Sequence, residues 1–186
     1  MLLAPNKLES YRQIPKVENP QEVKLLTSPP SWAKEKRLRG RKAQGMVFER
    51  AFHKYLKKIL SSNSFQLLHN PWFSYQEQVE GDAKQGDAKL SFCQPDFILE
   101  DLDWGLVIET KTTRNLDGIK QLLSLYRPII KAWKPEKNWT FCLCYRAYAG
   151  DFTEDWYPFS KVRDVISFAA GTDKTGSYTE LFFTGG

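Results

Sequence analysis

The sequence CQPDFILEDLDWGLVIETKTT, residues 93–113, decides the fold that we expect for this chain. The apolar run at residues 97–99 predicts a short strand, and the polar stretch at residues 100–103 predicts a turn. Residues 104–112 predict a second strand. A hairpin of this length brings the start of its first strand beside the end of the second. Residues at that open end of the hairpin are therefore expected to meet.

Two carboxylates and one lysine lie at the open end of this hairpin. Asp96 precedes the first strand and Glu109 lies near the end of the second, so the two can converge. Side-chain alternation places Lys111 on the same face as Glu109. Carboxylates hold a hard divalent cation through oxygen, and a lysine beside it can act on polarised water, which suits phosphodiester hydrolysis. The alternative is an ordinary hairpin whose charges pair on a solvated face.

Pro95-Asp96, followed by Glu109-x-Lys111, resembles the active-site signature of the PD-(D/E)XK nuclease superfamily. The resemblance implies an α/β fold with a restriction-endonuclease-like core, in which helices flank a mixed central β-sheet. It implies a DNA nuclease that depends on Mg²⁺ or Mn²⁺. Asp96, Glu109 and the carbonyl of Thr110 are implied as metal ligands. Lys111 is implied as the catalytic lysine, which either takes the proton or stabilises the hydroxide.

The helix before the hairpin offers a further ligand. Apolar residues recur at helical spacing over residues 45–60, which predicts a helix. Glu49 and His53 lie four residues apart on one face, at the border of the apolar stripe. The resemblance implies an acidic residue on this helix and, in the RecB-like exonuclease branch, often a histidine. We prefer Glu49 as the metal ligand and keep His53 as the alternative or second one; without a metal, Glu49 would form a surface ion pair with Lys54 or His53.

The helix after the hairpin departs from the RecB-like pattern. It is predicted over residues 119–133, with Asp117 as its N-cap and a bend at Pro128. RecB-like nucleases tend to carry Gln-x-x-x-Tyr here, whereas Gln121 and Tyr126 are one residue further apart. In a regular helix that spacing turns Tyr126 away from Gln121 and into the core. Gln121 then either faces the cleft, where its amide can contact DNA phosphate, or is an exposed glutamine without a role.

The remaining sequence predicts more strands than helices. Strands are expected at residues 72–79, 89–99 and 138–148. Residues 161–168 predict short strands or a helix, and residues 178–183 predict a strand. The order of helix, three strands, helix and strand describes an α/β domain with a mixed sheet, and the resemblance covers roughly residues 45–148 of it.

The charge excess lies in one segment. The chain has a formal net charge of +5, and residues 34–42, KEKRLRGRK, contain six basic side chains and one acidic one. This segment is either a solvated basic linker or an arm that binds phosphates by releasing counterions. Its position before the first helix favours the arm. The expected DNA contacts are Lys34, Lys36, Arg37, Arg39, Arg41 and Lys42.

Length and composition limit the remaining possibilities. The 186 residues suit one domain, with residues 45–186 as the nuclease-like part and residues 1–44 as an extended or loosely helical basic arm packed on it. No apolar run reaches membrane-spanning length, and the start lacks a signal peptide, so we expect a cytoplasmic protein of a bacterial or phage-infected cell without a membrane partner.

Cysteine and histidine usage excludes two kinds of metal centre. The three cysteines, Cys93, Cys142 and Cys144, form no CxxC pair, so neither a disulfide framework nor an Fe–S cluster is expected. We expect them to be buried thiols. With two histidines in the chain, a zinc site is not expected either.

The sequence therefore predicts a Mg²⁺- or Mn²⁺-dependent DNA nuclease. One rival is a sequence-specific endonuclease or junction resolvase of the same superfamily, which would act as a homo-oligomer. A rival of another class is a DNA-binding protein with this fold but no catalysis. The intact trio of Asp96, Glu109 and Lys111 argues against that second rival.

Overall fold

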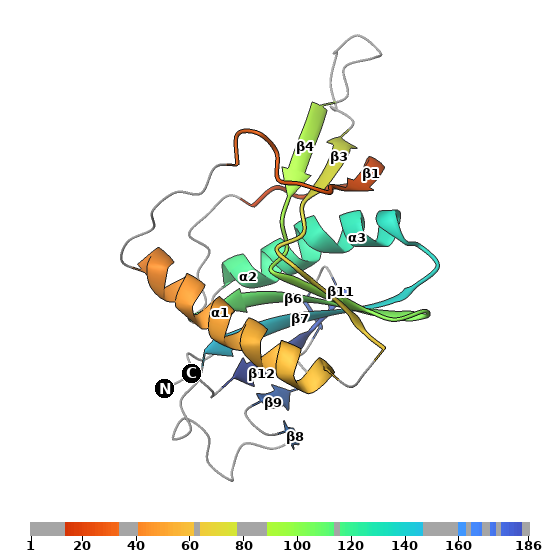
Figure 1. The fold of residues 1–186 in the computed structure, drawn as a ribbon. Helices are drawn as coiled ribbons and strands as arrows, with labels where there is room; N and C mark the ends of the chain where they lie inside the picture. The colour runs from red at the N-terminus through yellow and green to blue at the C-terminus, as the bar shows by residue number, and fades with distance from the viewer. Residues whose placement is uncertain are drawn as a thin grey trace.

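The computed structural model describes residues 14–33, 41–61, 64–77, 89–113, 116–146, 160–162, 165–168, 172–173 and 176–183. Within them the protein is a mixed α/β structure, with helices packed on a large sheet and a small sheet above it (Figure 1). The helical elements are α1 (Arg41–Leu60), α2 (Leu116–Lys120), the π-helical turn η2 (Gln121–Tyr126) and α3 (Arg127–Trp133). The strands are β1 (Gln21–Leu25), β2 (Gln66–His69), β3 (Phe73–Glu77), β4 (Lys89–Cys93), β5 (Phe97–Glu100), β6 (Trp104–Lys111), β7 (Asn138–Arg146), β8 (Ser160–Val162), β9 (Val165–Phe168), β10 (Thr172–Asp173), β11 (Gly176–Ser177) and β12 (Thr179–Phe183).

The large sheet is mixed, as the sequence predicted. Its strands run in the order β2-β5-β6-β7-β12-β9-β8. β6 is parallel to β7, and β7 is parallel to β12, whereas the other neighbours are antiparallel. The predicted hairpin is confirmed as β5 and β6, and the strand at the C-terminus is confirmed as β12. Residues 161–168 contribute β8 and β9, so the alternative of a helix there is wrong.

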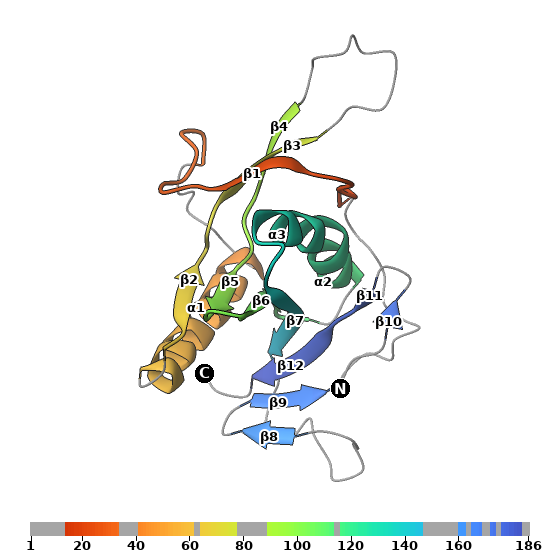
Figure 2. The same ribbon diagram turned by 90° about the vertical axis from the view of Figure 1, so that its right-hand side faces the viewer.

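Helices cover both faces of this sheet. Because side chains alternate along a strand, Val107 faces the segment α2–η2–α3, while its neighbour Ile108 faces α1. Phe52 of α1 packs with Ile108 in one apolar cluster, and Leu122 of η2 packs with Val107 in the other. Figure 2 shows the two helical layers on opposite sides of the sheet.

The predicted strand at residues 89–99 is wrong as a single element. β4 belongs to a small sheet of order β1-β3-β4, whereas β5 belongs to the large one. Pro95 in the gap has no N–H to donate to a strand partner, so a ladder cannot continue through it. The break places Asp96 at the point where the chain passes from one sheet to the other.

The N-terminal segment is more regular than predicted. Residues 21–25 form β1, which pairs with β3. Upstream, the N–H of Val17 donates to the carbonyl of Ser124 at 2.9 Å. That carbonyl lies four residues before Pro128, which cannot donate the usual helical hydrogen bond to it. The N-terminal segment thus satisfies a helix acceptor that proline leaves free.

Both predicted helices are present with changed boundaries. α1 begins at Arg41. The second helical segment begins at Leu116, so Asp117 lies inside α2 and the prediction of an N-cap there is wrong. Pro128 lies in the first turn of α3, directly after η2. β2 was not predicted at all.

The three cysteines are free and buried, as expected. Cys142 and Cys144 pack on the α1 face of the sheet, and Cys93 lies in the other apolar cluster. None of the described helices has the length and apolar character needed to cross a membrane.

Candidate active site

The β5–β6 register brings the predicted residues together. Phe97 pairs with Ile108, so the residue before Phe97 lies beside the end of β6. There, Asp96 Oδ2 accepts hydrogen bonds from the Thr110 N–H (2.7 Å) and the Thr110 hydroxyl (2.5 Å). The convergence of Asp96 with Glu109 was predicted from hairpin length, and the register confirms it.

Glu109 is a buried carboxylate with an oxygen that has no hydrogen-bond partner among the described residues. It is 2% exposed, and its Oε1 forms an ion pair with Lys111 Nζ. Its Oε2 is buried and accepts no hydrogen bond from any residue that the structure describes. Burial raises the pKa of Glu109 to about 8, the negative charge of Asp96 contributes to this rise, and Lys111 opposes it. Within the described part of the chain, one buried oxygen of this side chain therefore lacks a hydrogen-bond partner.

Lys111 is held from two directions. Its Nζ donates to Glu109 Oε1 and, at 3.1 Å, to Gln121 Oε1. Its aliphatic stem packs against Gly118 of α2, where an added Cβ would lie 3.2 Å from Lys111 Cγ. Glycine at this position lets α2 approach the lysine closely. Lys111 therefore has a defined orientation toward Glu109.

The predicted separation of Gln121 and Tyr126 is wrong. η2 is π-helical, and in a π-helix residues five apart lie on the same face. Gln121 Nε2 consequently donates to Tyr126 Oη, and the Tyr126 hydroxyl donates to the carbonyl of Gln94 at 2.9 Å. Tyr126 is buried, as predicted, but its polar end joins a chain of hydrogen bonds that reaches Lys111 through Gln121. The Tyr126 hydroxyl also acts on Glu109, where it is the smallest of the effects that lower the pKa of the carboxyl.

Glu49 of α1 approaches the site from the opposite face of the sheet. Its Oε1 accepts a hydrogen bond from Asn70 Nδ2 (2.7 Å) and lies 2.7 Å from His69 Nε2. Burial raises the pKa of Asp96, and the negative charge of Glu49 adds to this effect, whereas Thr110 and Lys111 oppose it. The negative charges of Glu49 and Glu109 therefore both lie close to Asp96.

The expectation that Glu49 pairs with Lys54 or His53 is wrong, because its partners come from the end of β2 instead. His53 stacks on His69, with ring centroids 3.9 Å apart. Burial, followed by the charge of His69, lowers the pKa of His53. His53 thus supports the ring that contacts Glu49.

Asn70 ties these groups to Asp96 and was missed from the sequence. Its φ of 53° is left-handed, a conformation that asparagine tolerates better than most residues. Its N–H donates to the carbonyl of Asp96 at 2.8 Å, and its own carbonyl accepts from Gln94 Nε2 at 3.1 Å. One signal could have found it: His69-Asn70-Pro71 ends a short apolar run with polar residues and proline, as Gln94-Pro95-Asp96 does.

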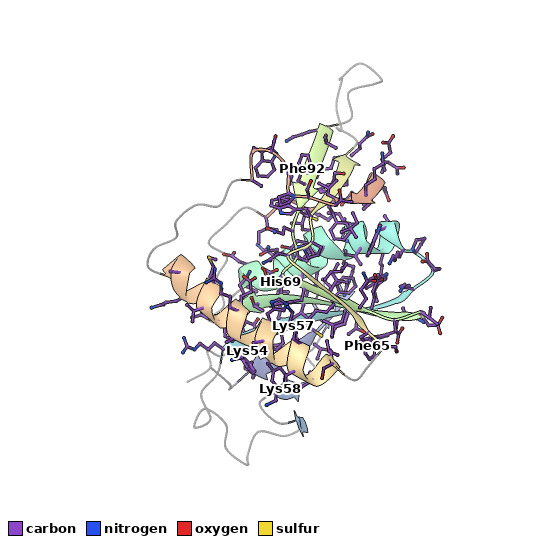
Figure 3. The ribbon with its side chains drawn as sticks, viewed as in Figure 1. Lys54, Lys57, Lys58, Phe65, His69 and Phe92 are labelled. Atoms are coloured by element: carbon purple, nitrogen blue, oxygen red, sulfur yellow. The ribbon has the colours of Figure 1, made fainter. Side chains whose placement is uncertain are left out.

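An open pocket of about 1450 Å³ lies over Asp96 and Glu49. Gln94, His69 and Asn70 also line it, and Figure 3 shows His69 near the centre of this face. Glu109, Lys111 and His53 are not among the described residues that line the pocket. Glu109 lies beneath the surface, and Gln121 contacts Lys111 rather than the pocket.

The predicted basic contacts cannot be placed. Lys34, Lys36, Arg37 and Arg39 lie outside the described residues. Arg41 and Lys42 form the first turn of α1, but their side chains lie outside the described part of the chain.

The donor atoms at the site suit a hard divalent cation. Glu109 Oε2 is a buried, unpaired oxygen beside the negative charge of Asp96, and a cation would satisfy both. The set is made of oxygen, which favours Mg²⁺ or Mn²⁺ over softer ions. Within the described residues, no group of three His, Cys, Asp or Glu side chains meets closely enough to hold a metal ion. A cation would therefore rest on Asp96 and Glu109, completed by backbone oxygen and water.

Comparison with known proteins gives no family assignment: no family model matches the chain, and no curated protein or solved structure is significantly similar to it.

Proposed function

We propose that this chain is a metal-dependent nuclease that hydrolyses phosphodiester bonds in DNA, built on a restriction-endonuclease-like core. The observation that carries the proposal is the buried, unpaired Oε2 of Glu109 beside Asp96. A buried carboxylate oxygen without a partner destabilises a fold, and such groups gather at functional sites. Lys111, which contacts Glu109, adds the third group of the PD-(D/E)XK pattern.

Asp96 and Glu109 would hold the cation, with the Thr110 carbonyl as a further oxygen ligand and Glu49 acting through water or on a second ion. When bound, a divalent cation lowers the pKa of water and offsets negative charge on the phosphate oxygens. The Thr110 N–H and hydroxyl hold Asp96 Oδ2 in place. Because Oδ2 is already bonded twice, Oδ1 is the oxygen of Asp96 that remains for the cation.

Lys111 is the group placed to handle a proton. Its Nζ is bonded to Glu109 and Gln121, and its side chain is 23% exposed. A neutral lysine would accept a proton from water there, whereas a charged lysine would stabilise the hydroxide. Gln121 orients it in both cases, and the hydrogen bond from Gln121 to Tyr126 keeps the amide oxygen toward the lysine.

The substrate would enter through the open pocket. Asp96 and Glu49 lie in its lining together with Arg50, whose exposed guanidinium can contact phosphate. The predicted basic arm at residues 34–42 would add sequence-independent affinity.

The test is a cleavage assay on linear and circular DNA, each single- and double-stranded, with Mg²⁺, Mn²⁺ or EDTA. We expect cleavage with either metal and none with EDTA. Asp96→Asn should abolish it, whereas Asp103→Asn, an exposed acid in the turn at the other end of the same hairpin, should not. Cutting of circular DNA would identify an endonuclease, and cutting of linear DNA alone an exonuclease. Full activity of Asp96→Asn, or no cleavage with any substrate and metal, would reject the proposed function.

A further inference from the structure

An exposed tryptophan stands at the rim of the pocket. Trp32 is 60% exposed, although its ring contacts two other aromatic rings edge-on. Its centroid lies 5.4 Å from that of Trp72 and 5.7 Å from that of Phe92. These contacts orient Trp32 without burying it. A large aromatic ring that is held in place and still accessible to solvent is typical of a binding surface.

These aromatic residues belong to the same segments as the candidate active site. Trp72 follows Asn70 by two residues, and Phe92 precedes Asp96 by four. The N–H of Leu26 donates to the carbonyl of Trp72 at 2.8 Å, which fastens the loop that carries Trp32 to the site. Trp32, Trp72 and the carboxylates Asp96 and Glu49 line one pocket. A single extended ligand can therefore contact both the aromatic rim and the carboxylates.

Exposed cations follow the outer face of α1, and one of them, Arg50, borders the pocket together with Glu49. The solvent-facing surface of α1 carries Arg50, Lys54, Lys57 and Lys58, all exposed. None of these side chains forms an ion pair with the described residues, and the single acid of α1 is Glu49. In the view of Figure 3, Phe92, His69 and Lys54 follow one another from the small sheet to α1. The cations of α1 thus continue along the helix from Arg50, which shares the pocket with Trp32 and Asp96.

We propose that Trp32 is a base-stacking residue that binds an unpaired nucleotide of single-stranded DNA whose phosphates run over α1. Exposed cations with an aromatic platform are the chemistry of single-strand binding, because every base has a face that can stack. Inside a duplex both faces of each base are already covered by neighbouring bases, so Trp32 discriminates against paired DNA. The inference deepens the proposed function by naming its substrate class, and it rests on that function only for the identity of the reaction.

Binding is measured in EDTA, so that cleavage does not interfere. Fluorescence anisotropy of a labelled oligonucleotide, titrated with the full chain, compares single-stranded DNA with the matched duplex. Wild-type protein is expected to bind the single strand more tightly. Trp32→Ala should weaken single-strand binding roughly tenfold and duplex binding little, since one stacked base is lost. A matched single-stranded RNA shows whether the sugar also matters.

Three further variants separate stacking from other effects. Trp32→Tyr keeps an aromatic face and should retain most of the affinity, whereas Trp32→Leu keeps apolar area and should bind as weakly as Trp32→Ala. Leu102→Ala removes a 91% exposed side chain from the β5–β6 turn and should bind like wild type. Thermal melting of each variant checks the fold, and the Tyr and Leu variants preserve the test if Trp32→Ala unfolds.

The stacking site is overturned if Trp32→Leu binds single-stranded DNA like wild type, or if Trp32→Ala weakens duplex and single strand equally. A change in oligomeric state without a change in DNA affinity would also overturn it, because Trp32 would then contact a second copy. Cleavage assays are read separately. If binding depends on Trp32 but no DNA is cleaved, only the proposed nuclease activity is rejected. If DNA is cleaved but neither binding nor cleavage changes in the Trp32 variants, only the stacking site is rejected.

Discussion

Two buried glutamates lie at opposite ends of the β5–β6 hairpin, and their surroundings differ sharply. Glu100 is 4% exposed and Glu109 is 2% exposed. Lys134 Nζ donates to both oxygens of Glu100, at 2.8 and 2.6 Å, and Lys137 Nζ lies 3.1 Å from Oε2. Among the described residues, Glu109 has one lysine on one oxygen and no hydrogen-bond partner on the second.

The pKa values of the two glutamates move in opposite directions. Burial acts to raise the pKa of Glu100, but hydrogen bonds from Lys134 and Lys137 outweigh it and lower the pKa. At Glu109, burial and the charge of Asp96 outweigh Lys111, and the pKa rises to about 8. The two side chains are similarly inaccessible to solvent, but Glu109 lies deeper in the protein, so solvent exposure alone does not decide the role of a glutamate. The cations around Glu100 pair both of its oxygens, whereas among the described residues Glu109 has a cation on one oxygen.

The largest expected effect is on the cleavage rate, which should depend on the Glu109 end of the hairpin and not on the Glu100 end. Asp96→Asn, Glu109→Gln and Lys111→Ala should each lower the cleavage rate by roughly a thousandfold or more, because the three act as one unit. Glu100→Gln, at the other end of the hairpin, should leave the rate unchanged. Steady-state cleavage with Mg²⁺ measures both, and the losses in double mutants should be far from additive. An equal loss in Glu100→Gln would remove the functional distinction between the two ends.

The second effect concerns the clamp. Glu100→Gln should lower the free energy of unfolding by ~2 kcal/mol, because Lys134 and Lys137 lose their buried partner. The folded pKa of Glu100 is lowered, so its contribution is present above the unfolded value of about 4.3 and is lost as pH falls through the folded value. Urea denaturation at pH 7 and at acidic pH measures this difference. A wild-type advantage that persists in strong acid would contradict it.

The third effect sharpens the description of the Glu109 end. Glu49 adds negative charge next to Asp96, so Glu49→Gln should raise the metal concentration needed for half activity roughly tenfold. His53→Ala should change it much less, because His53 contacts His69 rather than the pocket. Titration of cleavage with Mg²⁺ compares them. A larger shift in His53→Ala would make His53 the ligand of this helix.

The smallest effect is a gain in stability. Glu109→Gln should raise the free energy of unfolding at pH 7 by ~1 kcal/mol, since it removes a carboxyl whose ionised form the fold disfavours even with Lys111 as its partner. The folded pKa of Glu109 is raised, so ionisation destabilises the fold increasingly from the unfolded value of about 4.3 up to about 8. The gain should therefore vanish near pH 4. Thermal melts at both pH values measure it, and a variant less stable than wild type at pH 7 would show that Glu109 is satisfied.

Local sequence determined the hairpin and much of the candidate site. Alternation along β6 put Glu109 and Lys111 on one face, and hairpin length brought Asp96 to them. These relations depend on residues within one short stretch, where backbone geometry leaves few choices. The helix of Glu49 followed from apolar periodicity in the same way.

Tertiary structure decided which hydrogen-bond partners the polar groups of the candidate site have. The strand break at Pro95 depends on two sheets competing for the chain, and the partners of Glu49 come from β2, which local pattern did not predict. The π-helical turn that joins Gln121 to Tyr126 lies directly before Pro128, which leaves the carbonyl of Ser124 to accept from Val17. Each of these outcomes depends on hydrogen-bond partners distant in the chain. The sequence by itself determined which charged groups meet at the hairpin, and only the tertiary structure decided which of them are satisfied, because buried polar groups take their partners from whatever the fold packs against them.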